Sequence, residues 1–511
     1  MRPVPAALLC LAVSAAACGG ADAGYRAPTS GCEGWSFCDS IETRGRFDAL
    51  QGFLRTGEVI AYRDLREDGT ASAWFSTPTA EEAIAPRAVR SVTSPGPERA
   101  ELIVAVPRTE GAEGYESALY GGRIDLRRWT PGGGAVLLAE NVVSASWALC
   151  GTGEWLWTIE GESSAQPFPN CGDDVLRNLR DGRVATLPDQ CSAHDWYGRF
   201  TPDCRFFTGS WSTLHVDLAS GERTPGDPSW RLDPLGRDDR HLLLAAGSDD
   251  PDDPSTTMRI VRASDLGAVA RVDDVYDFGQ RTFSPDGAWF AYDRFGGSDR
   301  KQVHVVHLAD DRRVSVQAFG AIHSAVAFSP AGDRAAYLSW SDVTDDALAD
   351  LVLFDLADGS ARTLDRSASG AVPRHTAPTP YYGHSVGRPP FSFDATGRWL
   401  VFARASEEPS VRDRERELVV ADTMTGATRA LSPPAACPDC AEHPLLLSSA
   451  HSADGRWLAW VSPKGSLYLA DLAAGDGGAR VSEGPVADVV FGDGELAWIS
   501  KGYLLVAPLD P

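Results

Sequence analysis

Short runs of apolar residues alternate with polar turns along most of this chain. One phrase recurs at the turns: an aromatic residue, a small polar residue, Pro or a neighbour, Asp and Gly, followed by a hydrophobic run. It is cleanest at residues 283–287 (Phe-Ser-Pro-Asp-Gly), before the apolar run 289–292. Pro fixes φ at the second turn position, and Asp-Gly tolerates positive φ. The pattern therefore predicts a tight turn between two antiparallel strands.

The phrase returns at intervals of tens of residues and is followed each time by further strand patterns. Its copies lie at 200–203, 283–287, 328–332, 393–397, 452–455 and 491–494. A third strand, as at 351–356, and a polar fourth strand, as at 359–364, complete each unit. Four antiparallel strands per repeat are typical of a β-propeller blade, which has two apolar faces and needs stacked neighbours to bury them.

This phrase, together with the third-strand patterns at 214–221 and 352–359, resembles the TolB-like propeller family with its WD40-like, PD40-type repeats. That family includes periplasmic scaffold proteins and the propeller halves of serine peptidases. We therefore expect an all-β fold, with residues 46–511 forming a single large β-propeller of four-stranded blades. About nine units are recognisable. The count would be eight units if one pair of units is misassigned, and ten units if the first hairpin is a blade of its own.

The last unit ends at 503–508 and leaves no room for an outer strand. We expect a strand from the N-terminal region, such as 58–62 or 71–75, to complete that blade. Sharing a blade between the two ends closes the ring and removes exposed sheet edges.

The N-terminus predicts export. Residues 1–17 have an Arg, an apolar run and small residues, as a signal peptide does, and Cys18 follows, as in a bacterial lipobox. Ala15 stands where a lipobox usually has Leu. Plain signal-peptide cleavage after residues 21–23, without a lipid, is therefore the alternative. Residues 18–45 then form the lipidated cysteine and a tether. No other apolar run reaches the roughly 20 residues of a membrane span, so any anchor would be lipid. The residue after Cys18 is Gly rather than the Asp associated with inner-membrane retention, so the expected location is the cell envelope, in the outer membrane and facing the periplasm or the surface.

Eight cysteines remain besides Cys10 and Cys18, and an even number in an exported chain suggests disulfides. By sequence proximity they group as Cys32/Cys38, Cys150/Cys171, Cys191/Cys204 and Cys437/Cys440. Proximity is one of 105 possible connectivities. The last pair could also be a redox or metal site, but the two prolines at 433–434 favour a disulfide in a loop. We expect no metal and no cofactor.

The formal net charge is −24. Nucleic acids and anionic lipid headgroups bind basic surfaces, so neither is an expected partner. The acidic runs 248–253 and 342–346 lack the spacing of a calcium-binding loop and read as solvated loops.

Ser385 lies in the G-x-S-x-G pattern of serine hydrolases at 383–387. That chemistry needs a strand-to-helix turn, whereas two prolines and the next propeller strand follow here, so Ser385 is not expected to be a nucleophile. Residues 366–390 instead predict a long loop between blades. Long loops on rigid scaffolds often bind ligands, which makes Tyr381, Tyr382 and His384 the candidate binding residues.

The remaining aromatic and histidine candidates fit the propeller. His304 and His307 lie three apart on a strand and are expected on opposite faces. Large aromatic residues recur at one repeat position, as core residues would: Trp289, Trp399 and Trp457. Trp35 and Trp196 lie outside that position and could contact a ligand.

These observations favour a non-catalytic scaffold that binds a protein or peptide of the cell envelope. A hydrolase or lyase with its site in the propeller channel is the first alternative. It needs inward polar residues, but Ala325, Ala327, Ser448 and Ala450 occupy such positions, with Gln280 and Asp488 as exceptions. The second alternative is a small-molecule or glycan binder that uses the loops around 160–175 and 366–390.

Overall fold

The structure of the chain is a computed structural model. It describes residues 41–55, 57–66, 70–89, 92–93, 101–108, 123–150, 152–160, 173–187, 199–201, 203–208, 215–224, 230–237, 240–247, 255–276, 281–295, 301–310, 312–317, 326–339, 349–368, 391–405, 416–431, 448–462, 465–475, 478–482 and 485–509.

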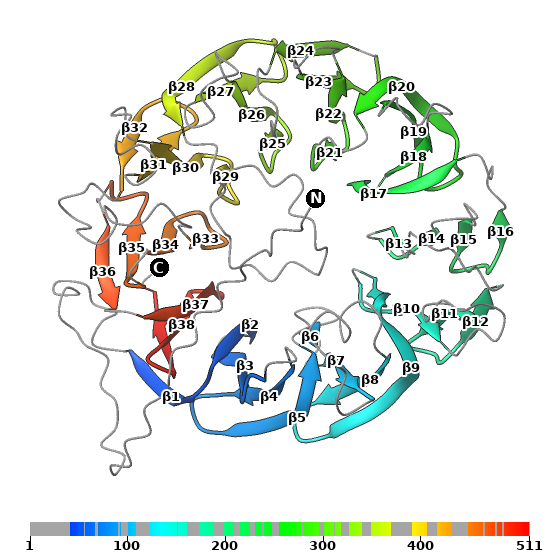
Figure 1. Ribbon diagram of the computed structural model, residues 1–511, viewed down its shortest axis with the longest axis vertical. Coiled ribbons are helices and arrows are strands. Elements are labelled where there is room, and N and C mark those ends of the chain that lie inside the picture. The colour runs from blue at the N-terminus through cyan, green and yellow to red at the C-terminus, as the bar shows by residue number, and fades with distance from the viewer. Residues whose placement is uncertain are drawn as a thin grey trace, which may run out of the picture.

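The described residues form antiparallel sheets arranged around a ring, as Figure 1 shows, which confirms the predicted all-β propeller. Ten four-stranded units can be traced among them, each running from its innermost to its outermost strand.

Blade 1 contains β2 (Ala49–Arg55), β3 (Glu58–Arg63), β4 (Thr70–Ser76) and β5 (Glu81–Val89). Blade 2 contains β6 (Val92–Thr93), β7 (Leu102–Pro107), β8 (Arg123–Thr130) and the first half of β9 (Gly134–Leu149). Blade 3 contains the second half of β9, β10 (Trp155–Glu160), β11 (Asp173–Asn178) and β12 (Val184–Leu187).

The next four units follow the same order. Blade 4 contains β13 (Arg199–Phe200), β14 (Phe206–Thr208), β15 (His215–Asp217) and β16 (Arg223–Thr224). Blade 5 contains β17 (Arg231–Arg237), β18 (His241–Gly247), β19 (Ser255–Arg262) and β20 (Ala268–Tyr276). Blade 6 contains β21 (Arg281–Phe283), β22 (Trp289–Phe295), β23 (Lys301–His307) and β24 (Arg313–Gln317). Blade 7 contains β25 (Val326–Phe328), β26 (Arg334–Ser339), β27 (Ala349–Asp355) and β28 (Ala361–Ala368).

The last three units complete the ring. Blade 8 contains β29 (Phe391–Phe393), β30 (Trp399–Ala405), β31 (Arg416–Asp422) and β32 (Thr428–Ala430). Blade 9 contains β33 (Ser448–His451), β34 (Trp457–Val461), β35 (Leu467–Asp471) and β36 (Ala479–Ser482). Blade 10 contains β37 (Val486–Phe491), β38 (Glu495–Ser500), β39 (Tyr503–Pro508) and, as its outer strand, β1 (Glu42–Arg46).

The strand order gives the ring two different faces. The turns between the first and second strands of a blade, and between its third and fourth strands, lie on one face, which we call the turn face. The connections between the second and third strands, and from one blade to the next, lie on the opposite face, which we call the loop face.

Ring closure by an N-terminal strand is confirmed, but the expected strands are wrong. Glu42 pairs with Val506 and Thr43 with Leu505, so β1 is the missing outer strand and the propeller extends upstream of residue 46. Residues 58–62 and 71–75 belong to β3 and β4 and form blade 1 with β2 and β5. The closing strand is hard to recognise in the sequence because an outer strand needs no apolar alternation, and only Arg44 among the residues of β1 is buried.

Apolar side chains fill the spaces between neighbouring blades. Between blades 8 and 9, Val401 and Leu418 pack with Leu458 and Trp460, which are almost fully buried. The recurring tryptophans are core residues as predicted, since Trp289 and Trp457 are buried and Trp399 packs against the same cluster. Because each blade buries its faces only against its neighbours, the stability of the ring depends on every interface.

The recurring phrase forms the predicted turn at the inner edge of the turn face. In blade 6 the amide of Trp289 donates to Ser284 Oγ at 2.9 Å, and Gly287 N donates to the Ser284 carbonyl at 2.8 Å. Blade 9 repeats this arrangement, with Gly455 N 3.0 Å from the Ser452 carbonyl. Both glycines have φ near +70°, a conformation that costs other L-residues about 1–2 kcal/mol.

One disulfide of the described residues joins two of these turns. Cys150 in blade 3 stands where blade 6 has Ser284, because its sulfur accepts from Trp155 N at 3.2 Å. Cys204 in blade 4 stands at the glycine position of its turn and keeps φ at 56°. The two cysteines are bonded, with their Cα atoms 5.5 Å apart.

The expected local pairing is therefore wrong for these two residues, although both do form a disulfide. Cys150 does not pair with Cys171, nor Cys204 with Cys191, because repeat position rather than sequence proximity brings the sulfurs together. The other cysteines of the expected pairs lie outside the described residues: Cys32, Cys38, Cys171, Cys191, Cys437 and Cys440.

Replacing both cysteines should separate the effect of the crosslink from that of the turn. Both Cys150→Ala/Cys204→Ala and Cys150→Ser/Cys204→Gly lose a bond that closes 54 residues, which costs about 2–4 kcal/mol. The Ser/Gly variant restores the turn sequence of the other blades, so we expect it to be more stable than the Ala/Ala variant by about 2 kcal/mol. Urea unfolding measures the difference, and equal stability of the two variants would contradict the equivalence of the turns.

Arg44 should contribute to closure of the ring. It is 8% exposed, and its Nη1 donates to the carbonyls of Gly57 at 2.8 Å and Ser76 at 3.5 Å in blade 1. We expect Arg44→Met to lower the free energy of unfolding by about 1–3 kcal/mol, since it leaves buried carbonyls without a donor. The matched variant Arg46→Met, at an exposed site, should cost under about 0.5 kcal/mol. Equal effects in thermal or urea unfolding would refute a special role for Arg44.

Candidate functional site

The candidate binding residues fall on a connection of the loop face. Tyr381, Tyr382 and His384 lie outside the described residues, in the segment between β28 and β29. That segment leaves the ring after Ala368 and re-enters it at Phe391, and both strand ends lie on the loop face. Ser385, Trp35, Trp196, His375 and Cys18 also lie outside the described residues, so their predicted roles remain predictions.

The connections of the two faces differ in length. On the turn face, adjacent strands are joined by tight turns such as 284–288 and 356–360. On the loop face, long segments join β28 to β29 and β32 to β33. Surface segments of this length on a rigid scaffold commonly hold binding residues.

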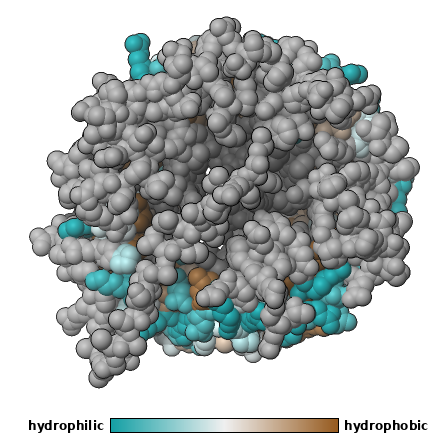
Figure 2. Space-filling view, viewed as in Figure 1, coloured by the Kyte–Doolittle hydropathy of each residue, from teal (hydrophilic) through white to brown (hydrophobic). Residues whose placement is uncertain are grey.

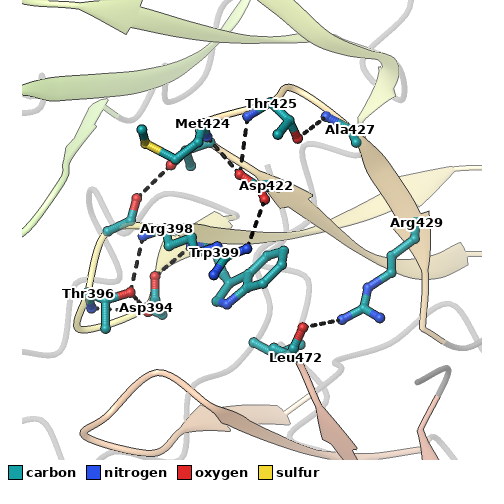
Figure 3. Close-up of polar contacts among 12 residues, drawn as sticks. Asp394, Thr396, Arg398, Trp399, Asp422, Met424, Thr425, Ala427, Arg429 and Leu472 are labelled. Atoms are coloured by element: carbon teal, nitrogen blue, oxygen red, sulfur yellow. Dashed lines mark hydrogen bonds and ion pairs between the residues drawn. The ribbon is translucent and has the colours of Figure 1, made fainter. Parts of the chain in front are cut away.

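The turn face is held by a set of polar contacts, which Figure 3 shows for blade 8. Asp394 accepts from the amide of Trp399 at 2.7 Å, and Asp422 accepts from the amide of Met424 at 2.8 Å. The guanidinium of Arg398 lies 3.5 Å from Asp422 and 4.7 Å from the centroid of the Trp399 ring. These contacts fix the two turns of the blade relative to each other.

Arginines on the outer strands, or in the turn just before one, bridge successive blades on this face. Arg312 donates to the carbonyl of Ala357 at 3.0 Å, Arg362 donates to the carbonyl of Thr423, and Arg429 donates to the carbonyl of Leu472 at 2.9 Å. Sequence reasoning missed these bridges. A signal was present, because Arg362 and Arg429 each lie three residues after the glycine of the turn before the outer strand.

The rim of the ring is mixed in character. In the view of Figure 2, hydrophilic side chains gather along the lower rim, over the blue and cyan blades of Figure 1, with smaller hydrophobic areas among them.

The histidine pair of β23 is structural. His304 is buried and stacks on Tyr292, with ring centroids 5.3 Å apart. His307 lies beside Trp289, and its Nδ1 is 2.6 Å from Asp310, a hydrogen bond that lowers the pKa of Asp310. The two histidines lie in different environments, as their predicted opposite orientation requires. In the part of the chain that the structure describes, no three His, Cys, Asp or Glu side chains form a metal-binding group.

His215, on β15, is a buried histidine whose surroundings shift its pKa. It is 3% exposed, its Nδ1 lies 3.1 Å from Thr208 Oγ1, and it stacks on Phe206 at 4.7 Å. Burial lowers the pKa of His215, and the nearby carboxylates of Asp217 and Asp265 oppose that shift only in part.

Asp488, one of the two polar exceptions at the channel-lining position, has a structural contact. Its Oδ2 accepts from the amide of Leu50 at 2.9 Å and so joins the inner strand of blade 10 to that of blade 1. Gln280, the other exception, lies outside the described residues.

No protein-family model matches the chain, and no curated protein matches it in sequence. Its fold is similar to the structure of a eukaryotic initiation factor, with 12% identity, a TM-score of 0.50, and coverage of 88% of this chain and 98% of that one. TolB from Acinetobacter baumannii is similar at 10% identity and a TM-score of 0.28, over 70% of this chain and 80% of that one. An oligogalacturonate lyase in complex with manganese has 14% identity and a TM-score of 0.32, over 80% of this chain and 96% of that one. At these identities the similarity concerns the fold alone.

A search of the described residues for a helix that is long and apolar enough to cross a bilayer finds none.

His215 should make stability depend on pH. Its pKa in the folded protein lies below the unfolded value of about 6.5, so folding favours the neutral ring. This stability is fully present above about pH 6.5 and is lost progressively as the pH falls below that value. We expect His215→Phe, which keeps the stacking on Phe206, to reduce the slope of unfolding free energy against pH below about pH 6.5. His307→Phe controls for loss of a half-buried imidazole. An unchanged slope in His215→Phe would refute the assignment.

Proposed function

We propose that this protein is an exported β-propeller, anchored by lipid at Cys18, that binds a protein or peptide of the cell envelope through its loop face. The observation that carries the proposal is the division of the ring into two unlike faces. One face is closed by short turns, and the other receives the long connections, including the one that holds Tyr381, Tyr382 and His384.

The turn face suits the role of a rigid base. Its arginines are already engaged in bridges between blades, as Arg312 and Arg429 are, and its carboxylates accept from the turn amides, as Asp422 does. A rigid base holds the strand ends from which the loop-face connections start at fixed positions around the ring, which limits the ordering cost when a partner binds.

The inner strands support binding rather than catalysis. Asp488 is committed to the contact with Leu50 that joins the first and last blades. The other positions at which the repeat predicts inward-facing residues carry small residues such as Ala327, which packs against the core, and Ala450. The TolB-like character of the repeat phrase also favours an envelope scaffold, as part of this proposal.

The position of β1 supports an orientation for the anchored ring. Glu42 pairs with Val506 at the turn-face end of blade 10, while Arg46 pairs with Tyr503 at the loop-face end. The chain upstream of Glu42 therefore leaves the ring from the turn face. A lipid on Cys18 would hold that face nearer the membrane and leave the loop face free for a partner.

Site-specific photo-crosslinking in native membranes tests this proposal. A benzophenone side chain at position 382, on the loop-face connection, should give a stoichiometric adduct with one envelope protein. The matched site is Met424, which is 62% exposed on the turn face and should give no such adduct. In the Cys18→Ser variant, the protein should leave the membrane fraction.

Three results would count against the proposal. Equal adducts from positions 382 and 424 would refute the loop face as the binding surface. No adduct from position 382 would refute a protein partner at this connection. Retention of Cys18→Ser in the membrane fraction would refute the lipid anchor.

A further inference from the structure

The outer edge of blade 2 differs from most other outer edges of the ring. The first half of β9 reads Gly-Ala-Val-Leu-Leu-Ala over 134–139 and carries no charge. Most other outer strands carry charged residues, for example Glu81 on β5, Arg271 on β20 and Arg362 on β28, whereas β12 (Val-Ala-Thr-Leu) does not. Such charges normally keep an edge strand from pairing with another chain.

Apolar side chains are exposed on this strand and its neighbour. Val136 is 55% exposed and Leu137 is 49% exposed, on consecutive positions that point to opposite sides of the blade. Val184, on the outer strand of blade 3, is 57% exposed. On an edge strand, one apolar side chain on each side would offer apolar contacts to both faces of an added strand.

The backbone edge of this half of β9 is open. One side of the strand pairs with β8, from Thr130↔Gly134 to Leu126↔Ala139. Its pairing with β10 begins only at Val142, so residues 134–139 present unpaired edge groups among the described residues. By contrast, the edge of β12 is partly covered, because Arg223 donates to the carbonyl of Thr186 at 3.1 Å.

The start of this strand is held in place from blade 1. Glu82 accepts from the amide of Gly132 at 3.1 Å, in the turn that leads into β9. The edge is therefore preorganised as an extended strand, which reduces the ordering cost of adding another.

Two arginines lie directly behind the exposed apolar pair. Arg128 is the cross-strand partner of Val136, and Arg127 is that of Leu137. Among the described residues, neither arginine side chain has a hydrogen bond or an ion pair, unlike most arginines of the turn face. In a chain with a net charge of −24, two unpaired cations beside an open edge favour an acidic partner.

We propose that residues 134–139 of β9 form a strand-addition site for an extended peptide segment of a partner protein, with apolar residues at its centre and carboxylates at its ends. Backbone hydrogen bonds to the open edge would supply the affinity. Contacts with Val136, Leu137 and the two arginines would supply the specificity. A second copy of this chain is disfavoured, since residues 134–139 of its own β9 carry no carboxylate that could face the two arginines. The site is independent of the loop face.

The test uses the full-length protein and a labelled octapeptide with Val-Ile-Val-Thr between pairs of glutamates. We expect the octapeptide to bind, as measured by fluorescence anisotropy. Its binding should slow amide hydrogen exchange only in those fragments of the protein that contain residues 134–139. Leu137→Lys places a charge on the edge at an exposed position and should weaken binding at least tenfold. Ala361→Lys, at an exposed position of the outer strand β28, is the matched control and should leave the affinity unchanged.

A second probe tests the charge argument. The same peptide with lysines in place of glutamates should bind at least tenfold more weakly. The Arg127→Glu variant should show a smaller difference in affinity between the two peptides. Absence of exchange protection at 134–139, or equal loss of binding in Leu137→Lys and Ala361→Lys, would overturn the proposal. A concentration-dependent dimer that Leu137→Lys abolishes would also overturn it, because the occupant would then be a second copy.

Discussion

The close approach of neighbouring turns at the inner edge of the turn face is the contact on which the ring depends. A Cβ placed at Gly332 of blade 7 would lie 2.7 Å from Asp286 Cγ of blade 6, and one at Gly455 of blade 9 would lie 2.0 Å from Asp394 Oδ2 of blade 8. Both distances are shorter than van der Waals contact allows. A glycine at this position therefore serves two needs at once, a positive φ and space for the preceding blade.

The disulfide of blades 3 and 4 is a variation on that contact. At Cys204 a side chain is present where the other turns have glycine, and it extends toward the residue that a glycine would have approached. Here a covalent bond joins the two turns where the other blades have a close contact. Cys204 adopts a positive φ although it is not a glycine, which costs conformational energy. The disulfide joins the blade with the shortest described strands, β13 to β16, to its neighbour.

Much of the fold could be predicted because turns and apolar strands leave a clear pattern. The phrase around Ser284 predicted a turn between two strands, and that turn is present. The repeated tryptophans predicted core positions, and Trp289 and Trp457 are buried. The identity of the closing strand could not be predicted, since β1 is an exposed edge with little apolar pattern. The Cys150–Cys204 pairing required aligning the repeats with each other, whereas proximity in sequence pointed elsewhere. The binding candidates were proposed from loop length alone, and Tyr381, Tyr382 and His384 lie outside the described residues.

The pairing of Glu42 with Val506 also has a consequence for how the protein is made. The first strand of the ring has no partner until the last strands have been synthesised, so the propeller cannot be completed while the chain is still emerging. The entropy of closing so long a loop grows only slowly with its length, but pairing of distant segments is slow and exposes unpaired edges to aggregation meanwhile. A chain truncated before β39 would lack the third strand of blade 10 and leave β1 unpaired. Completion of the ring thus acts as a check that translation has reached the end of the propeller.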